Sequence, residues 1–119
     1  MVKQTPITDL LTAGLNAADL RGRAIANNIA NMSTDGYRRY DVEFEKILAR
    51  QLSRGGKVDL DDIAPRVHQP MDTPVGPNGN DVELEREVGQ MAKNSAMYRA
   101  YMRMLGKMYQ QMEAAIGGT

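Results

Sequence analysis

The last third of the chain carries a continuous row of apolar positions whose spacing alternates between four and three residues. No proline interrupts this row. A 3.5-residue repeat of this length is typical of a helix that packs lengthwise against another helix. It predicts a helix over residues 81–116 with the following positions on one face, here called the first row: Leu84, Val88, Met91, Ser95, Tyr98, Met102, Leu105, Tyr109, Met112 and Ile116.

A second apolar row lies one residue out of register with the first, about 100° further around the same helix. The two rows together form an apolar face that is too wide for a seam between two helices. We expect the N-terminal helix to cover the first row and a neighbouring subunit to cover the second. The alternative is that the middle of the chain folds back over the second row, which consists of Met97, Tyr101, Met104 and Met108.

The N-terminal part predicts a second helix, over residues 5–32, with Thr5 as its cap and Pro6 in its first turn. Its own apolar stripe contains Gly14 and Gly22, and each interior glycine costs about 1 kcal/mol relative to alanine. Close approach of another helix would explain both glycines. We expect the first row, from Leu84 to Met112, to pack against the large and small apolar residues of this stripe: Ile7, Leu11, Ala18, Ile25 and Ile29.

The middle, residues 33–80, has no long periodic pattern. The segment from Val42 to Leu52 suggests a short amphipathic helix or a strand, and the four prolines and two glycines between Pro65 and Gly79 exclude a long regular element. Asn80 followed by Glu83 resembles a capping box at the start of the C-terminal helix. We therefore predict a single all-α domain: an antiparallel helical hairpin or coiled coil, with an irregular middle segment outside it.

Charge is distributed unevenly along the C-terminal helix. Acidic residues such as Glu83, Glu85 and Glu87 crowd its first turns, and basic residues from Lys93 to Lys107 occupy its second half. Matching to the helix dipole is the simplest explanation. The whole chain has a formal net charge of zero, so no overall field attracts nucleic acid.

Composition argues against catalysis and metal binding. The chain has no cysteine, so disulfides and thiolate sites are excluded, and His68 is its single histidine. No apolar run reaches the roughly 18 residues that a membrane-spanning helix needs. We expect no enzymatic activity, no cofactor, no metal site and no small-molecule substrate.

The segment from Ala26 to Phe44, ANNIANMSTDGYRRYDVEF, is the most specific stretch of the sequence. Asn28 and Asn31 place amides near the exit of the N-terminal helix, and Gly36 can adopt the positive φ that the following turn needs. Tyr37 would then fold back onto the helices. Two interpretations stay open: an ordinary helix end and turn, or a buried amide that fixes the register of a helix pair.

This segment resembles the N-terminal signature of the bacterial flagellar axial proteins, which build the rod and hook. The C-terminal segment from Asn78 to Leu105 is similar to the FlgB type of proximal rod protein within that family. The family commonly has proline before the glycine, where this chain has Asp35, which is also a good turn residue. The residues that match the signature are Asn28, Asn31, Thr34, Gly36 and Tyr37.

The resemblance implies a structural subunit that polymerises into the drive shaft of the flagellar motor. It implies export from the cytoplasm by the flagellar type III apparatus without a cleaved signal peptide, and a place in the basal-body rod on the periplasmic side. Its partners would be like subunits, other rod proteins, the rod-to-ring adaptor and the export apparatus. The alternative is a soluble helical adaptor that presents its methionine-rich face to a partner helix or a membrane surface.

Overall fold

The computed structural model describes residues 6–55 and 58–117, so the predicted cap Thr5 lies outside the described residues. The chain is mostly helical and contains a small two-stranded sheet. The two long elements are α1 (Ile7–Ala30) and α3 (Leu84–Gly117). Between them the chain forms β1 (Asp41–Glu43), α2 (Glu45–Ser53), the 3-10 helix η1 (Leu60–Ile63) and β2 (Arg66–His68).

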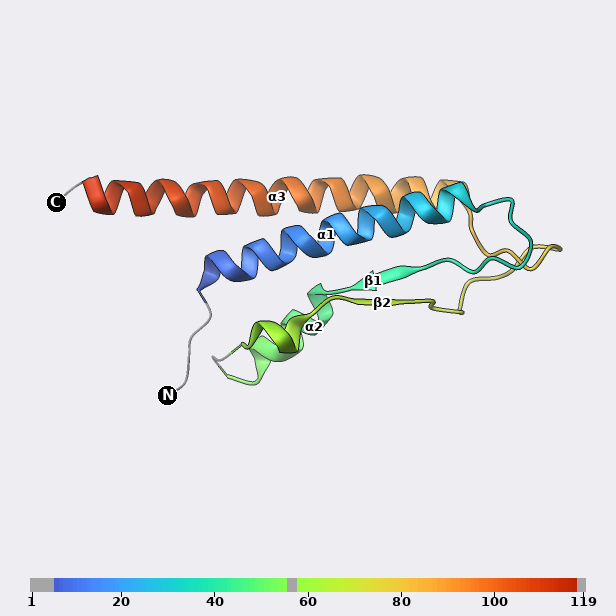
Figure 1. The fold of residues 1–119 in the computed structure, drawn as a ribbon, viewed down its shortest axis with the longest axis horizontal. Helices are drawn as coiled ribbons and strands as arrows, with labels where there is room; N and C mark the ends of the chain where they lie inside the picture. The colour runs from blue at the N-terminus through green and yellow to red at the C-terminus, as the bar shows by residue number, and fades with distance from the viewer. Residues whose placement is uncertain (1–5, 56–57, 118–119) are drawn as a thin grey trace.

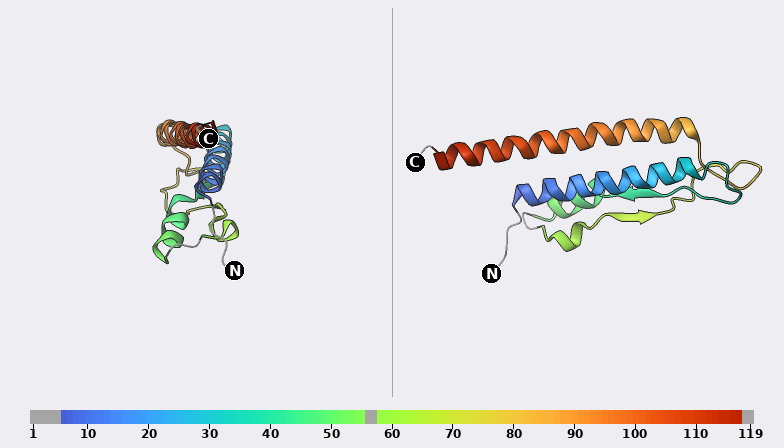
Figure 2. Two further views of the ribbon diagram at one scale, coloured as in Figure 1. Left: turned by 90° about the vertical axis from the view of Figure 1, so that its left-hand side faces the viewer. Right: turned by 45° about the horizontal axis from the view of Figure 1, so that its top comes forward.

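The molecule is elongated, with extents of 66 × 29 × 16 Å. Helices α1 and α3 lie side by side and run in opposite directions (Figure 1). The middle segment runs along α1, so that α1 lies between α3 and the sheet (Figures 1 and 2). Strands β1 and β2 are antiparallel, with Asp41 opposite His68 and Glu43 opposite Arg66. No helix in the described ranges combines the length and the apolarity that crossing a membrane requires.

The hydrophobic core lies between α1 and the middle segment. Phe44 and Ile63 are each 1% exposed and pack against Ala17 of α1, together with Val58. Leu10, Ala13, Ile47 and Leu48 surround this cluster. The expectation of an irregular middle is therefore wrong for residues 41–55 and 58–68, which form β1, α2, η1 and β2 and are anchored to α1 by large apolar side chains, on the side of α1 away from α3. Within Pro65 to Gly79 the only regular element is β2, in agreement with the prolines.

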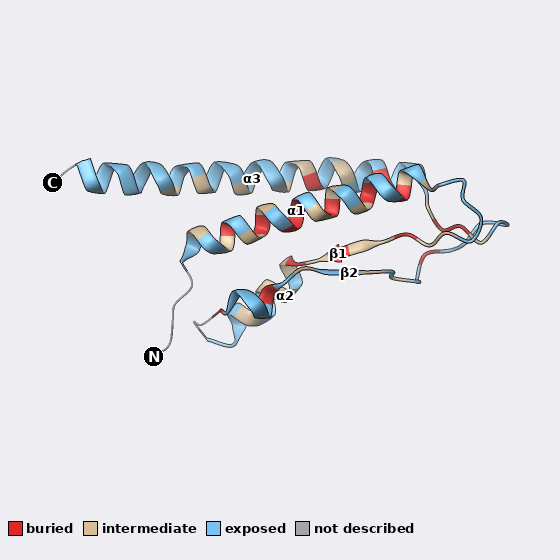
Figure 3. Ribbon diagram, viewed as in Figure 1, coloured by how far each residue is buried: buried red, intermediate tan, exposed pale blue. Residues whose placement is uncertain are grey.

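The contact between α1 and α3 has a different character. The buried side chains of α3 are both polar, Glu87 and Asn94 (Figure 3). Tyr101 packs beside them, over Gly14 of α1, where a built Cβ would approach the tyrosine ring to 2.6 Å. The expected close approach of a helix backbone is therefore wrong at Gly14, because the space that its missing side chain leaves is filled by the Tyr101 ring.

The exposure of the two apolar rows of α3 differs from what the sequence suggested. Met97, Tyr101 and Met108 of the second row are half-buried against this chain, and only Met104 of that row is largely exposed. In the first row, Met91 and Leu105 are half-buried. The other large side chains of this row are 43–75% exposed, so the single chain does not bury Leu84, Val88, Tyr98, Met102, Tyr109 and Met112 against α1, although Tyr98 borders a groove whose other wall is α1.

On α1, most of the predicted packing residues are buried. Leu11, Ala18 and Ile25 are buried, and Ile29 is half-buried, whereas Ile7 is 48% exposed. The 3.5-residue repeat identifies the direction of a helical seam but not which side of a wide apolar face meets the partner. The rotation of α3 is set instead by the small residue at Gly14, which admits the Tyr101 ring, and by the polar partners of Glu87 and Asn94.

Helix α3 begins three residues later than predicted. The Asn80 backbone N–H donates to Asn78 Oδ1 at 3.2 Å, and Asn80 Oδ1 accepts from the Val82 N–H at 2.8 Å. The predicted capping box is therefore wrong, because Glu83 would have to accept the hydrogen bond that Asn78 takes.

Replacing Gly14 by alanine tests the close packing of the two helices. The added methyl group collides with the Tyr101 ring, and we expect Gly14→Ala to lower the free energy of unfolding by about 1–3 kcal/mol. Gly106→Ala is the matched control, because no atom lies within 4 Å of its built Cβ; it should raise stability by about 1 kcal/mol through helix propensity. Chemical denaturation measures both. Equal changes in the two variants would contradict the packing.

Candidate functional site

Asn28 lies at the end of α1 and is fully buried. Its amide nitrogen donates to the Tyr40 carbonyl oxygen at 2.9 Å and to Glu87 Oε2 at 3.1 Å. Its amide oxygen accepts from the Tyr37 hydroxyl at 3.0 Å and from the Tyr40 N–H at 2.9 Å. All four hydrogen-bonding positions of the amide are therefore used. Because a slip in register would leave several buried groups unpaired, this amide fixes how α1 and α3 meet.

Glu87 of α3 carries a buried charge at the same place. Its Oε1 accepts from Arg39 Nε at 2.7 Å, and both side chains are at least 93% buried. Asp81, whose side chain is also buried, accepts from the Arg39 N–H at 2.6 Å and from Arg38 Nε at 3.0 Å. Breaking a buried pair of this kind costs about 3–5 kcal/mol because a lone charge stays behind. The start of α3 is thereby fastened to the segment that follows α1.

The turn after α1, which contains Thr34 and Gly36, provides the third part of this cluster of contacts between the end of α1 and the start of α3. Gly36 has a φ of +74°, as its position in the turn requires, and its N–H donates to the Asn78 carbonyl oxygen at 2.8 Å. The side-chain amide of Asn80 donates to the carbonyl oxygens of Asn31 and Thr34 at 2.8 and 2.7 Å. Thr34 Oγ1 donates to Asn31 Oδ1 at 3.1 Å. We call this cluster, from Asn28 to Arg39 and from Asn78 to Glu87, the signature junction.

The structure thus brings all five signature residues into one cluster. Tyr37 folds back onto the helices as predicted, and its ring meets Tyr40 edge-on at a centroid distance of 6.1 Å. Burial, with the nearby Tyr40 and the carboxylates of Glu87 and Asp81, raises the pKa of Tyr37. The hydroxyl therefore stays protonated, as its donation to Asn28 requires.

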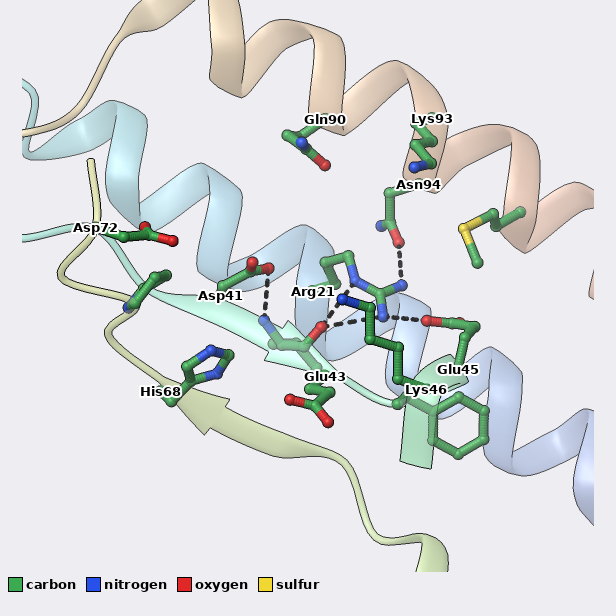
Figure 4. A pocket seen from close by; sticks show the side chains of 14 residues that line it. Arg21, Asp41, Glu43, Glu45, Lys46, His68, Asp72, Gln90, Lys93 and Asn94 are labelled. Carbon is green, nitrogen blue, oxygen red and sulfur yellow. Dashed lines mark hydrogen bonds and ion pairs between the residues drawn. The ribbon is translucent and has the colours of Figure 1, made fainter. Parts of the chain in front are cut away.

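A second polar cluster, here the Arg21 junction, joins α1, α3 and the start of α2 (Figure 4). Arg21 donates to Asn94 Oδ1 at 3.1 Å, to the Val42 carbonyl oxygen at 3.2 Å and to Glu45 Oε1 at 2.6 Å. Asn94 donates back to the Ala18 carbonyl oxygen at 2.8 Å. The Tyr101 hydroxyl donates to Glu45 Oε2 at 2.8 Å, and burial together with this bond raises the tyrosine pKa.

A groove beside the Arg21 junction is lined by charged side chains of both signs, among them Asp41, Lys46, Asp72 and Lys93 (Figure 4). Glu43 on its rim accepts from Arg66 and Arg50, and these bonds lower its pKa. Over the part of the chain that the structure describes, no three acidic, histidine or cysteine side chains gather in a way that could hold a metal ion.

Sequence reasoning identified Asn28, Asn31, Thr34 and Tyr37 but missed the polar packing roles of Arg21, Glu87 and Asn94, and it assigned Tyr101 to a contact with a neighbouring subunit. Glu87, Asn94 and Tyr101 follow one another at intervals of seven residues, so they form a stripe on the inner face of α3. Arg21 likewise continues the stripe of α1 between Ala18 and Ile25. Polar residues at the spacing of an apolar seam indicate buried polar contacts between the helices. This signal was available for Glu87, but that residue had been explained by the helix dipole alone.

Comparisons with known proteins bear on what these junctions belong to. A model of the flagella basal body rod protein family matches residues 10–38. The chain is 30% identical to the flagellar basal body rod protein FlgB of Salmonella typhimurium over 122 residues, covering 87% of this chain and 88% of that protein. It is 26% identical to FlgB of Bacillus subtilis over 117 residues, 91% of each chain.

The chain is also 31% identical to the flagellar basal-body rod protein FlgG of Caulobacter vibrioides over 87 residues. This match covers 73% of the chain but 27% of that protein. The similarity to FlgB therefore extends over nearly the full length of the relatives, whereas the similarity to FlgG is confined to part of a longer protein.

Replacing Asn28 by aspartate tests the signature junction. The change removes both donated hydrogen bonds and places a carboxylate against Glu87, so we expect Asn28→Asp to destabilise the fold by about 3 kcal/mol or more. Asn27→Asp, at the exposed neighbouring position, should cost a few tenths of a kcal/mol. In a double-mutant cycle with Glu87→Gln, the two changes should be strongly non-additive. Additive unfolding energies would refute the contact.

Replacing Tyr101 by phenylalanine tests the Arg21 junction. Tyr101→Phe should cost about 1 kcal/mol at neutral pH by removing the bond to Glu45. Because the folded-state pKa of Tyr101 is raised, its contribution is fully present below the unfolded value of about 10 and is lost as pH rises above it. Denaturation at pH 7 to 11 should show the difference between the two proteins shrinking. A difference that grows with pH would contradict this assignment, and Tyr109→Phe is the exposed control.

Proposed function

Because the chain belongs to the family of FlgB-type flagellar basal body rod proteins, we propose that it is a structural subunit that polymerises through its long helices into the drive shaft of the flagellar motor. The observation that carries this proposal is the similarity to FlgB over nearly the full length of both chains. Motility is then the process that the protein serves, and its role is mechanical and not catalytic.

The surface of α3 supports polymerisation. The exposed members of the first row extend from Leu84 to Ile116, over about 48 Å of helix, on the side that α1 leaves uncovered. Contiguous exposed apolar surface of this kind marks an interaction site. We therefore assign the inter-subunit contact to this row together with Met104, in coiled-coil packing against neighbours, and not to Met97, Tyr101 and Met108.

The two junctions support a role in transmitting torque between subunits. Each holds α3 to α1 through paired, buried polar groups, which have few alternative arrangements of equal energy. A subunit that keeps its two long helices in fixed register can pass a twisting force from one neighbour to the next.

The remaining proposals follow from family membership. The partners are like subunits, other rod proteins, the rod-to-ring adaptor and the flagellar export apparatus. The protein lies in the basal-body rod on the periplasmic side, after export without a cleaved signal peptide. The alternative of a soluble adaptor is less well supported, because three of the four residues of the methionine-rich second row are half-buried within the chain.

Purified basal bodies provide the test. Cells that lack the native chain are complemented with the native sequence, with Met102→Asp or with Gln111→Asp, and detergent- and salt-resistant basal bodies are probed for the chain. We expect the native chain and the Gln111 control to be present and the cells to swim. Met102→Asp should abolish both, because it places a charge on the proposed contact at a position that is 50% exposed in the monomer. Absence of the native chain from basal bodies would reject the rod function.

A further inference from the structure

A row of positive charge lies on the outer side of α3. It consists of Arg99, Arg103 and Lys107, which are all exposed and follow one another at intervals of four residues over about 12 Å of helix. Arg103 is about 160° around the helix from Tyr101, which packs against α1. This row, here the basic ridge, therefore points away from the rest of the chain, on a part of α3 that is largely exposed (Figure 3).

The basic ridge is unfavourable in the single chain. Residues three and four positions apart are neighbours on a helix surface, and those of Arg103 are Arg99, Ala100, Gly106 and Lys107. The ridge thus contains two like-charged pairs at i,i+4 spacing, which destabilise a helix. The helix dipole does not compensate for them, because its effect is confined to the last turn, which has no basic side chain, and Lys107 is ten residues before the helix ends.

Elsewhere in the described ranges, most basic side chains have a carboxylate partner within the chain. The paired residues are Arg21, Arg23, Arg38, Arg39, Arg50, Arg66 and Arg86. Within those same ranges the three residues of the basic ridge form no ion pair. Carboxylates from outside the chain would supply the missing partners and relieve the repulsion along the ridge.

We propose that the basic ridge binds an acidic segment of a different protein in the rod, with carboxylates spaced to match the three cations. The inference rests on the proposed function and adds the chemistry of one partner. The surface is distinct from the first row, since Arg103 is about 100° around the helix from Met102 and about 120° from Tyr109. Ala100 and Gly106 beside Arg103 are exposed and small, so a carboxylate can reach the planar guanidinium group in a two-point contact.

The described helices of a second copy do not provide such a segment. On α1 the carboxylates are Asp9 and Asp19, ten residues apart, and Asp19 already pairs with Arg23. The exposed carboxylates of α3 are Glu85 and Glu113, which are farther apart still. The acidic 3-10 helix η1 has four residues and spans about 8 Å, less than the length of the ridge. A different protein is therefore the better match.

Other anionic partners fit this surface less well. A bilayer would take up the exposed apolar residues of the first row, and Arg103 and Lys107 would then point away from it. A nucleic-acid site combines a basic patch with aromatic side chains on which bases stack. The neighbours of Arg103 on the ridge are instead alanine, glycine and two cations, and the whole chain has a net charge of zero.

Arg103→Glu separates the partner contact from the stability of the fold. The new carboxylate pairs with Arg99 and Lys107, so the purified variant should unfold at a higher temperature than the native chain. In cells that lack the native chain, the same variant should reduce the amount of chain per basal body several-fold, because it places negative charge against the acidic partner. Arg54→Glu, which reverses an exposed charge on another surface, is the matched control and should leave incorporation unchanged.

Photocrosslinking identifies the partner. The photoreactive amino acid p-benzoylphenylalanine replaces Gln110, which is exposed and lies three residues beyond Lys107, and basal bodies that contain this chain are irradiated. We expect an adduct with a different protein, through a peptide that carries several aspartates or glutamates. Changing these acidic residues to lysine should restore the incorporation of Arg103→Glu.

Several results would overturn the docking while leaving the rod function intact. They are full incorporation of Arg103→Glu, a lower unfolding temperature of this variant, and no restoration by the exchanged charges. An adduct with lipid, nucleic acid, a second copy or a peptide without acidic residues, or no adduct, would also overturn it. Absence of the native chain from basal bodies would overturn both the rod function and the docking.

Discussion

The position of α3 depends on a few buried polar groups at its first turns. Glu87 is held between Arg39 and Asn28, and Asp81 between the two arginines that follow the signature turn. None of these groups can leave its partner without remaining desolvated and unpaired. The constraint acts at one end of a long helix, and the Arg21 junction repeats it two turns further along.

This arrangement separates two tasks that a small helical protein often combines. Phe44, Val58 and Ile63 supply the hydrophobic core by packing the middle segment onto α1. The inner face of α3 fixes the orientation of this helix relative to α1, through the hydrogen bonds of Glu87, Asn94 and the Tyr101 hydroxyl. The apolar residues on its other side are thereby left for contact with neighbours.

Part of this organisation could be predicted from the sequence. The two long helices, the helix or strand after Val42, the positive φ of Gly36 and the return of Tyr37 to the helices followed from local spacing and turn chemistry. The rotation of α3 could not be predicted, because both of its apolar rows fit a seam and the choice depends on partners distant in sequence. Asn28 and Glu87 are 59 residues apart, and local patterns carry no information on such a pairing.

The short strands β1 and β2 and the 3-10 helix η1 were missed for a related reason. Elements of three or four residues such as β1, η1 and β2 are too short to have a convincing period. They form here because α1 offers small residues such as Ala17, against which Phe44 and Ile63 can pack.

The polar inner face of α3 also determines how the molecule responds to denaturant. The slope of unfolding free energy against denaturant concentration scales with the surface newly exposed to solvent. Because much of the apolar surface of α3 is already exposed, lifting this helix from α1 exposes little more of it, whereas separating α1 from the middle segment exposes the core. Detachment of α3 is therefore an opening with a small slope and a small heat-capacity change. The free energy that holds the long helix in place therefore comes more from its buried polar pairs than from apolar surface.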